Sequence, residues 1–240
     1  MGNFFYHFYR NLFLLPLRPF SRTHYDGMDL VPETGSALLL SNHISHFDPQ
    51  FMMAKFPRVV HFMADKPLLE IPLLGKMLKA SHVFPIDRTK SDRGALRTAM
   101  ARLESGNIVG IFPEKGIRHG KTSVLGGAEL PIGTASLWKM MDVPVIPMVI
   151  VGSDQMYALK NRPRRYRVFV RVGKPLPPDK NASREELRDR IAAAWRELLE
   201  AMKRDYDIQP RELPHSAQER WGQPAPVEVQ HDITDTLPPS

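Results

Sequence analysis

The residue types that could do chemistry lie together in one segment, residues 41–49, which reads SNHISHFDP and places His43 five residues before Asp48. Residues 37–43 are apolar and end in polar side chains, which predicts a buried strand ending at a functional edge. Pro49 suits the first turn of a helix, with Asp48 as its N-cap. A tight strand-to-helix turn can fold the Asp48 carboxylate back onto the imidazole, fix its tautomer and leave Nε2 free as a general base.

Such a base needs a hydroxyl to activate, and the chain supplies no convincing one of its own. There is no cysteine and no G-x-S-x-G nucleophile elbow, while turn chemistry explains Ser41 and Ser45 equally well. The simplest nucleophile is a substrate hydroxyl that attacks an acyl carbonyl without a covalent acyl-enzyme. Two other interpretations stay open. The pair can be a capping Asp beside a satisfied His, or His43, His46 and Asp48 can be metal ligands, although no second cluster of suitable spacing accompanies them.

The elements around this segment alternate between strands and helices. Further strands are predicted at residues 59–64, 82–86, 108–112, 143–151 and 165–172, the last with one solvent-facing side. Short helices or turns fit residues 66–80, and longer helices are expected at 91–104 with Ser91 as N-cap, at 127–140 and at 183–202. This alternation predicts an α/β layered domain over residues 24–204, followed by a disordered, Pro-rich tail at 205–240.

The composition bounds the class of protein. The 240 residues, 42% of them hydrophobic and 25% charged, fit one domain with small appendages. The lack of cysteine excludes disulfides and thiolate metal sites. A formal net charge of +7 makes nucleic acid, an anionic membrane surface and acidic substrates candidate partners. Residues 165–172 interleave arginine with aromatic side chains, but a strand with one charged face explains this more simply, and we expect no nucleic acid partner.

The N-terminal stretch is unusual, because residues 4–20 read FFYHFYRNLFLLPLRPF. The apolar run is too short to span a bilayer, and no small-residue cleavage site follows it. Aromatic rings mixed with arginine suit the headgroup region of a membrane. Residues 1–23 are therefore predicted to form an amphipathic membrane-interacting segment, in which Arg10, Arg18 and Arg22 attract anionic lipid. The alternative is a helix that packs on the core.

The segment at His43 resembles the H-x-x-x-x-D motif of the glycerolipid acyltransferases, the lysophosphatidic acid acyltransferase (PlsC-like) family. Three more blocks follow in that family's order. They are ADKPLLEIPLLG at 64–75 leading into VFPIDR at 83–88, FPEKGIR at 112–118, and VPVIP at 143–147. The resemblance covers about residues 37–152. One extra residue lies between Glu114 and Arg118, His119 replaces the usual Ser, and Pro85 interrupts the second block.

This resemblance implies a layered fold with a central mixed β-sheet flanked by helices, and transfer of a fatty acyl group to a lysophospholipid. The donor would be acyl-CoA or acyl-carrier protein, the acceptor 1-acyl-glycerol-3-phosphate, and the product phosphatidic acid. No cofactor and no metal are implied. His43 would be the base and Asp48 would orient it. The implied substrate-binding residues are Arg88 and Arg118 for a phosphate, Glu114 for the acceptor hydroxyls or the neighbouring Arg, Lys66 for added positive charge, and Gly116 for approach of backbone N–H groups to an anion.

The departures from the family pattern leave the acceptor open, and a lipid with another head group, such as an amino-acid lipid, is an alternative. A hydrolase that gives the acyl group to water and a non-catalytic basic module that binds membranes are further alternatives. Residues 66–80 are a second candidate to lie on the membrane, unless 68–78 complete the core. The expected location is the cytoplasmic face of the cell membrane, as a peripheral or monotopic protein.

Overall fold

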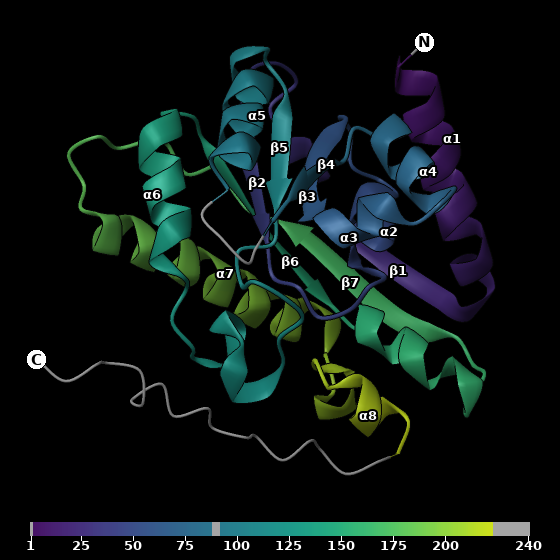
Figure 1. The fold of residues 1–240 in the computed structure, drawn as a ribbon. Coiled ribbons are helices and arrows are strands. Elements are labelled where there is room, and N and C mark those ends of the chain that lie inside the picture. The colour runs from purple at the N-terminus through teal and green to yellow at the C-terminus, as the bar shows by residue number, and fades with distance from the viewer. Residues whose placement is uncertain (1, 88–91, 223–240) are drawn as a thin grey trace, which may run out of the picture.

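A computed structural model describes residues 2–87 and 92–222 of the chain, with a seven-stranded sheet between two layers of helices (Figure 1). The strands are β1 (Ser21–Asp26), β2 (Ala37–Ser41), β3 (Val60–Asp65), β4 (Phe84–Ile86), β5 (Ile108–Ile111), β6 (Val145–Val151) and β7 (Tyr166–Val172). Their order is β1-β7-β6-β2-β5-β3-β4. The five strands from β6 to β4 run parallel, whereas β7 is antiparallel to β6 and parallel to β1. The predicted mixed α/β sheet is confirmed.

The helices cover both faces of this sheet. They are α1 (Gly2–Leu14), α2 (Asp48–Met53), α3 (Lys66–Glu70), α4 (Leu74–Ala80), α5 (Arg93–Glu104), α6 (Ile132–Met141), α7 (Arg184–Tyr206) and α8 (Ala217–Arg220). Short 3-10 segments lie between these elements in the described residues: η1 (Leu15–Phe20), η2 (Met28–Leu30), η3 (Gly120–Thr122), η4 (Val124–Gly126), η5 (Ser153–Lys160) and η6 (Pro210–Glu212). One layer contains α1 and α2, and the opposite layer contains α5, α6 and α7 (Figure 1).

Strand β2 shows why the chain folds into these layers. All five of its residues are buried, as expected for a central parallel strand that is covered on both faces. Its side chains alternate, so that Leu39 packs in the cluster with α2 while Leu38 and Leu40 pack in the cluster with α5, α6 and α7. This central strand places the segment with His43 at the carboxyl end of the parallel strands.

Both ends of the chain differ from the sequence predictions. The sheet begins within the predicted N-terminal segment 1–23, because β1 starts at Ser21 and pairs with β7. The predicted tail at 205–240 is wrong for residues 205–222. These residues complete α7 and form η6 and α8, held by ion pairs such as Arg167 Nε with Glu212 Oε1 at 2.7 Å. The polar composition of residues 205–222 gave no indication of these contacts. Residues 223–240 lie outside the described part of the chain.

Two local predictions are also corrected. Strand β7 has no fully solvent-facing side, because Arg171 is buried and pairs with Asp26 and Asp205. The N-cap of α5 is Asp92, whose carboxylate accepts the N–H groups of Gly94 and Ala95 at 2.9 Å, whereas Ser91 lies outside the described residues. Within residues 2–87 and 92–222, no helix combines the length and apolar character needed to span a bilayer.

Candidate active site

The site lies at the carboxyl ends of the parallel strands. His43 follows β2, Glu114 follows β5, and Ser153 follows β6. Since β5 and β6 are the two neighbours of β2 in the sheet, the polar residues that follow these three strands meet at one edge. This is where ligands bind in open parallel α/β sheets.

His43 and Asp48 form the predicted pair. The imidazole Nδ1 lies 2.8 Å from Asp48 Oδ2, and the His43 side chain keeps 17% of its surface exposed while the Asp48 side chain has none. With the Nδ1 proton directed at the carboxylate, Nε2 is the nitrogen that can accept a proton. The other ring contact of His43 is with Phe112, at 4.2 Å between ring centroids and an interplanar angle of 22°.

Besides His43, backbone N–H groups and serine hydroxyls donate hydrogen bonds to the Asp48 carboxylate. Its Oδ2 accepts the backbone N–H of Ile44 at 2.7 Å and that of Ser45 at 3.0 Å. Its Oδ1 accepts the hydroxyls of Ser45, at 3.0 Å, and Ser153. The prediction that Asp48 caps α2 is wrong, because Phe47 occupies the N-cap position and the Asp48 side chain folds back onto the preceding turn. These donors stabilise a carboxylate that is otherwise cut off from water.

Glu114 holds the backbone of His43. Its Oε2 accepts the N–H of His43 at 3.0 Å and its Oε1 accepts the N–H of Val124 at 2.7 Å. Burial raises the pKa of Glu114, and these two N–H groups act against that shift. The turn that follows is tight: Lys115 and Gly116 both have positive φ, 57° and 143°. Glu114 therefore lies where it can position the base, and its contact with an acceptor stays a prediction.

The remaining predicted binding residues have different surroundings. Arg118 is exposed; its backbone N–H donates to the His43 carbonyl at 2.8 Å, and its guanidinium forms no ion pair within the described part of the chain. Lys66 starts α3 at the end of β3, two strands from β2, and pairs with Glu70 at 3.8 Å on the surface. Arg88 lies outside the described residues. The anion-binding role of Gly116 stays a prediction.

Sequence reasoning missed two residues that complete the arrangement. Ser153 bonds to Asp48 from 105 residues away in the chain, and Asn42 bridges β2 to β6 by accepting the Ile150 N–H and donating to the Ile150 carbonyl, both at 2.9 Å. A signal for Ser153 exists: it is the first polar residue after a strongly apolar strand. Its partner could not be known without the order of the strands.

A cavity of about 340 Å³ lies at the same end of the sheet as the pair, although neither His43 nor Asp48 lines it. Phe112, whose ring stacks on His43, lines this cavity together with Pro113, and the other walls come from β3, β4, β5, α5 and α6. Most of this lining is apolar, including Met63, Leu96 and Leu137. The cavity therefore fits hydrocarbon better than a strongly polar ligand, and Phe112 connects it to His43.

The metal interpretation is not supported by the geometry of these residues. His46 turns away from the pair and places its Nδ1 2.6 Å from the Tyr157 hydroxyl. Within the ranges 2–87 and 92–222, no three His, Asp or Glu side chains converge as metal ligands would.

Most residues of this site lie in a region of the chain that matches a known protein family. The Acyltransferase family profile matches residues 22–151, which contain His43, Asp48 and Glu114. The chain belongs to the Acyltransferase family. Within this family the chain resembles proteins that are each named 1-acyl-sn-glycerol-3-phosphate acyltransferase.

The protein from Streptococcus pneumoniae is 29% identical over 175 residues, covering 72% of this chain and 62% of that relative. The protein from Bacillus subtilis is 28% identical over 120 residues, covering 50% of this chain and 56% of that relative. The chain therefore matches little more than half the length of these curated relatives. A crystal structure of the 1-acyl-sn-glycerophosphate acyltransferase PlsC from Thermotoga maritima shares the fold, with a TM-score of 0.66 and 23% identity over 84% of this chain and 79% of that one.

Proposed function

We propose that this chain transfers a fatty acyl group from a thioester, acyl-CoA or acyl-carrier protein, to the free hydroxyl of a lysophospholipid. The acceptor that the names of the relatives favour is 1-acyl-glycerol-3-phosphate, with phosphatidic acid as the product. The observation that carries the proposal is the hydrogen bond between His43 Nδ1 and a fully buried Asp48, within the matched family region.

In the proposed reaction, Nε2 of His43 accepts the proton of the acceptor hydroxyl as its oxygen attacks the thioester carbonyl. A C–O bond forms and the C–S bond breaks, and the leaving thiolate takes the proton back from the imidazolium. Asp48 holds the tautomer and stabilises the imidazolium. The chain has no cysteine, and within the described residues no serine hydroxyl is hydrogen-bonded to the His43 ring, which supports direct transfer over an acyl-enzyme.

Recognition of a phosphate would fall to cations near this edge. Arg118 is exposed, and its backbone N–H donates to the carbonyl of His43 at 2.8 Å. A guanidinium fork matches the oxygens of a phosphate better than an ammonium does. Lys115, which lines the cavity, can add positive charge. The assignments of Arg88, Lys66 and Gly116 are part of the same proposal.

We propose that acyl chains enter from the side of the molecule that carries α1. A second apolar hollow of about 120 Å³ lies between α1, α2 and α4, and Phe62 forms part of its wall. The Phe62 ring stacks on Phe112 at 5.6 Å, and Phe112 stacks on His43. A chain of aromatic contacts therefore connects this hollow to the base.

We also propose a peripheral position on the cytoplasmic face of the membrane. Helix α1 and η1 expose large apolar side chains, and so do α3 and the turn into α4. The exposed set is Phe4, Phe5, Phe8, Leu12, Leu15, Phe20, Leu68, Ile71 and Leu73. Aromatic and aliphatic groups gathered beside α1 and α4, which contact each other, suit the interface of a bilayer.

The decisive experiment replaces the base. Purified protein is incubated with radiolabelled acyl-CoA, or acyl-carrier protein, and a panel of lysolipids that includes 1-acyl-glycerol-3-phosphate and an amino-acid lysolipid. Thin-layer chromatography then separates diacylated lipid from free fatty acid. We expect diacylated product from the wild type and a loss of at least 10³-fold with His43→Ala.

Folding of His43→Ala is checked by its thermal midpoint, which should change little because the ring is partly exposed. A folded His43→Ala protein with wild-type turnover would refute the proposed mechanism. Free fatty acid as the main product would support a hydrolase, and vesicle binding without any turnover of thioester would support a non-catalytic module.

A further inference from the structure

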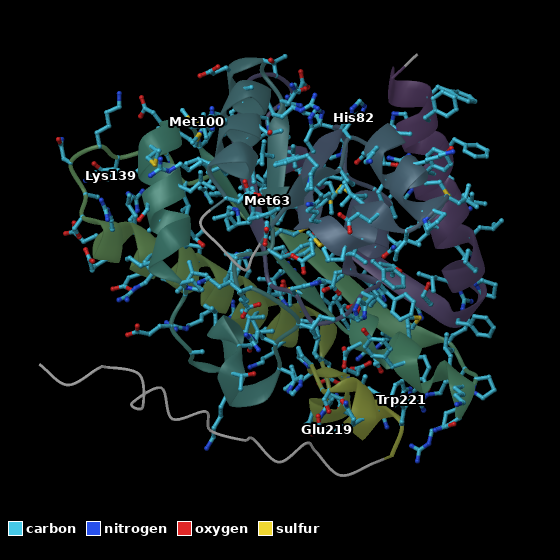
Figure 2. All side chains as sticks on the ribbon, viewed as in Figure 1. Met63, His82, Met100, Lys139, Glu219 and Trp221 are labelled. Atoms are coloured by element: carbon cyan, nitrogen blue, oxygen red, sulfur yellow. The ribbon has the colours of Figure 1, made fainter. Side chains whose placement is uncertain are left out.

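The segment that follows α7 folds back toward the active site. We call residues 207–222, which contain η6 and α8, the C-terminal strap. It packs against η5, the segment that directly follows β6 (Figure 1). Figure 2 shows Glu219 and Trp221 of the strap at this end of the molecule. The strap lies beyond residues 22–151, the region that matches the family profile.

The strap inserts Arg220 next to a buried carboxylate. Asp154, the second residue of η5, has no exposed side-chain surface, and Arg220 donates to its Oδ2 from Nε at 2.7 Å and from Nη2 at 2.6 Å. The backbone N–H of His215 also donates to this oxygen, at 2.9 Å. The pair is needed because an unpaired buried carboxylate is strongly destabilising. Burial raises the pKa of Asp154 to about 6 even with Arg220 present.

The arginine is itself fixed within the strap. Its Nη1 donates to the carbonyl of Arg211 at 2.7 Å, and its Nη2 donates to the carbonyl of Leu213 at 2.8 Å. One guanidinium thus joins the two short helices of the strap to η5. A lysine could keep the charge but could not make all of these bonds together.

Ser153, the residue before Asp154, contacts Asp48, the partner of the proposed base. Ser153 donates to Oδ1 of Asp48, and Asp48 in turn accepts from His43. A second connection runs in parallel: Trp221 donates from its indole to the Tyr157 carbonyl at 3.0 Å, and the Tyr157 hydroxyl bonds to His46. Both connections run from the strap through η5 to the segment that carries His43 and Asp48.

We propose that Arg220 is a positioning residue, which holds η5 so that Ser153 and Tyr157 keep the His43–Asp48 segment in its active geometry. The inference rests on the proposed function, because it assumes that His43 acts as the base. Its effect should appear in kcat, since Arg220 is separated from the acyl donor and acceptor by Asp154, Ser153 and Asp48, and should leave the KM for the lysolipid nearly unchanged.

The test separates positioning from simple compensation of a buried charge. The double variant Arg220→Met/Asp154→Asn removes both charges, and a neutral replacement of a buried ion pair usually folds. We expect it to fold, to lose about tenfold in kcat with KM within twofold, and to show faster amide hydrogen exchange over residues 43–48 and 153–160. If Arg220 only compensated a charge, this variant would keep wild-type kcat and exchange, and that result would overturn the proposal.

Two variants complete the comparison. Arg220→Lys retains the charge but not all of the guanidinium's hydrogen bonds, so it should recover kcat only in part, to about threefold below wild type. Arg211→Met is the matched control, because it removes an exposed cation from the same strap and keeps the backbone carbonyl, and it should behave as wild type. An equal loss of kcat in Arg211→Met would contradict a specific role for Arg220.

If the double variant does not fold, Trp221→Ala takes its place, because that side chain is 43% exposed and its loss leaves no buried charge. It should lower kcat and raise exchange over residues 43–48; wild-type values for both would refute the proposal. Hydrogen exchange also tests the positioning role of the strap when no acyl transfer is detected. If the wild type transfers no acyl group to any lysolipid, the proposed function fails, while unchanged exchange in the double variant would reject the strap's positioning role separately.

Discussion

Among single residues, Asp48 shows most clearly how local contacts would prepare His43 to act as a base. It accepts the N–H groups of Ile44 and Ser45, two hydroxyls and the imidazole of His43, although none of its side chain is exposed. Neutral donors hold the carboxylate in place while leaving its negative charge available to the imidazole. In the proposed reaction, that charge would stabilise a protonated His43.

Asp48→Asn tests this role while preserving shape. An amide oxygen at the position of Oδ2 can still accept the two backbone N–H groups, and the hydroxyls of Ser45 and Ser153 can rotate to accept from the amide nitrogen. We expect folding to persist and kcat to fall by about 10²–10⁴-fold, because the imidazolium loses its counter-charge. Steady-state acyl transfer and the thermal midpoint measure the two effects. Turnover within tenfold of wild type in a folded variant would contradict the assignment.

A second titratable residue affects stability rather than chemistry. His61 on β3 is buried, its ring stacks on His82 at 4.7 Å, and its Nδ1 has no hydrogen-bond partner. Burial, with a smaller contribution from His82, lowers the pKa of His61 to about 4. The unfolded chain therefore takes up a proton on this ring at a higher pH than the folded protein does.

This difference predicts the sign of a pH effect on unfolding. The contribution of His61 to stability is complete above pH ~6.5 and is lost as the pH falls toward 4. Urea unfolding at pH 7 and pH 4.5 should show that the wild type loses about 1–2 kcal/mol more than His61→Phe over this interval, a value reduced for solvent screening. Equal losses in the two proteins would show that His61 does not titrate in this way.

Among the elements, the pairing of β5 with β3 determines how the aromatic rings reach the base. Gly110 lies opposite Phe62 in the register of these strands, and a Cβ on Gly110 would come within 2.6 Å of the Phe62 ring and 2.7 Å of Val60 Cγ1. The missing side chain leaves room for Phe62 to lie flat and stack on Phe112, which contacts His43.

Gly110→Ala should therefore disturb both packing and activity. We expect a loss of about 1–3 kcal/mol in the free energy of unfolding, because overpacking forces Phe62 from its position. Urea unfolding measures this change, and kcat should fall as the ring against His43 moves. Gly133→Ala is the control for stability, since a Cβ there meets no atom within 4 Å. A Gly110→Ala protein as stable as the wild type would show that β3 yields without cost.

At the scale of the whole molecule, exposed apolar groups collect on one side. Helix α1 and the turn between α3 and α4 contribute most of them, while α6 with Met140 lies on the opposite side of the sheet (Figure 1). Leu73 is 70% exposed and has a φ of 65°, a strained conformation for a leucine. Together with a formal charge of +7, this face suits contact with an anionic bilayer.

Replacing Phe4, Phe5 and Phe8 by serine tests that face. We expect the partition onto vesicles of anionic phospholipid to fall at least tenfold in a cosedimentation assay, because three exposed rings no longer enter the interface. The thermal midpoint should stay near that of wild type. Met140→Ser is the matched control and should bind as wild type does. Binding by the wild type should weaken as NaCl is raised from about 50 to 300 mM, since salt screens the basic surface. Unchanged binding by the triple variant would place the membrane contact elsewhere.

The sequence by itself determined the His43–Asp48 pair, the buried strand that presents it and the alternation that gives a layered α/β domain. These features are encoded within a few residues, by apolar runs and by a turn of five residues. Only the tertiary structure decided that Ser153 completes the hydrogen bonds of Asp48, that Glu114 holds the His43 backbone, and that Arg220 returns to cover Asp154. Those contacts join residues 66 to 105 positions apart. They depend on which strands become neighbours in the sheet, and burial of both its faces settles that order.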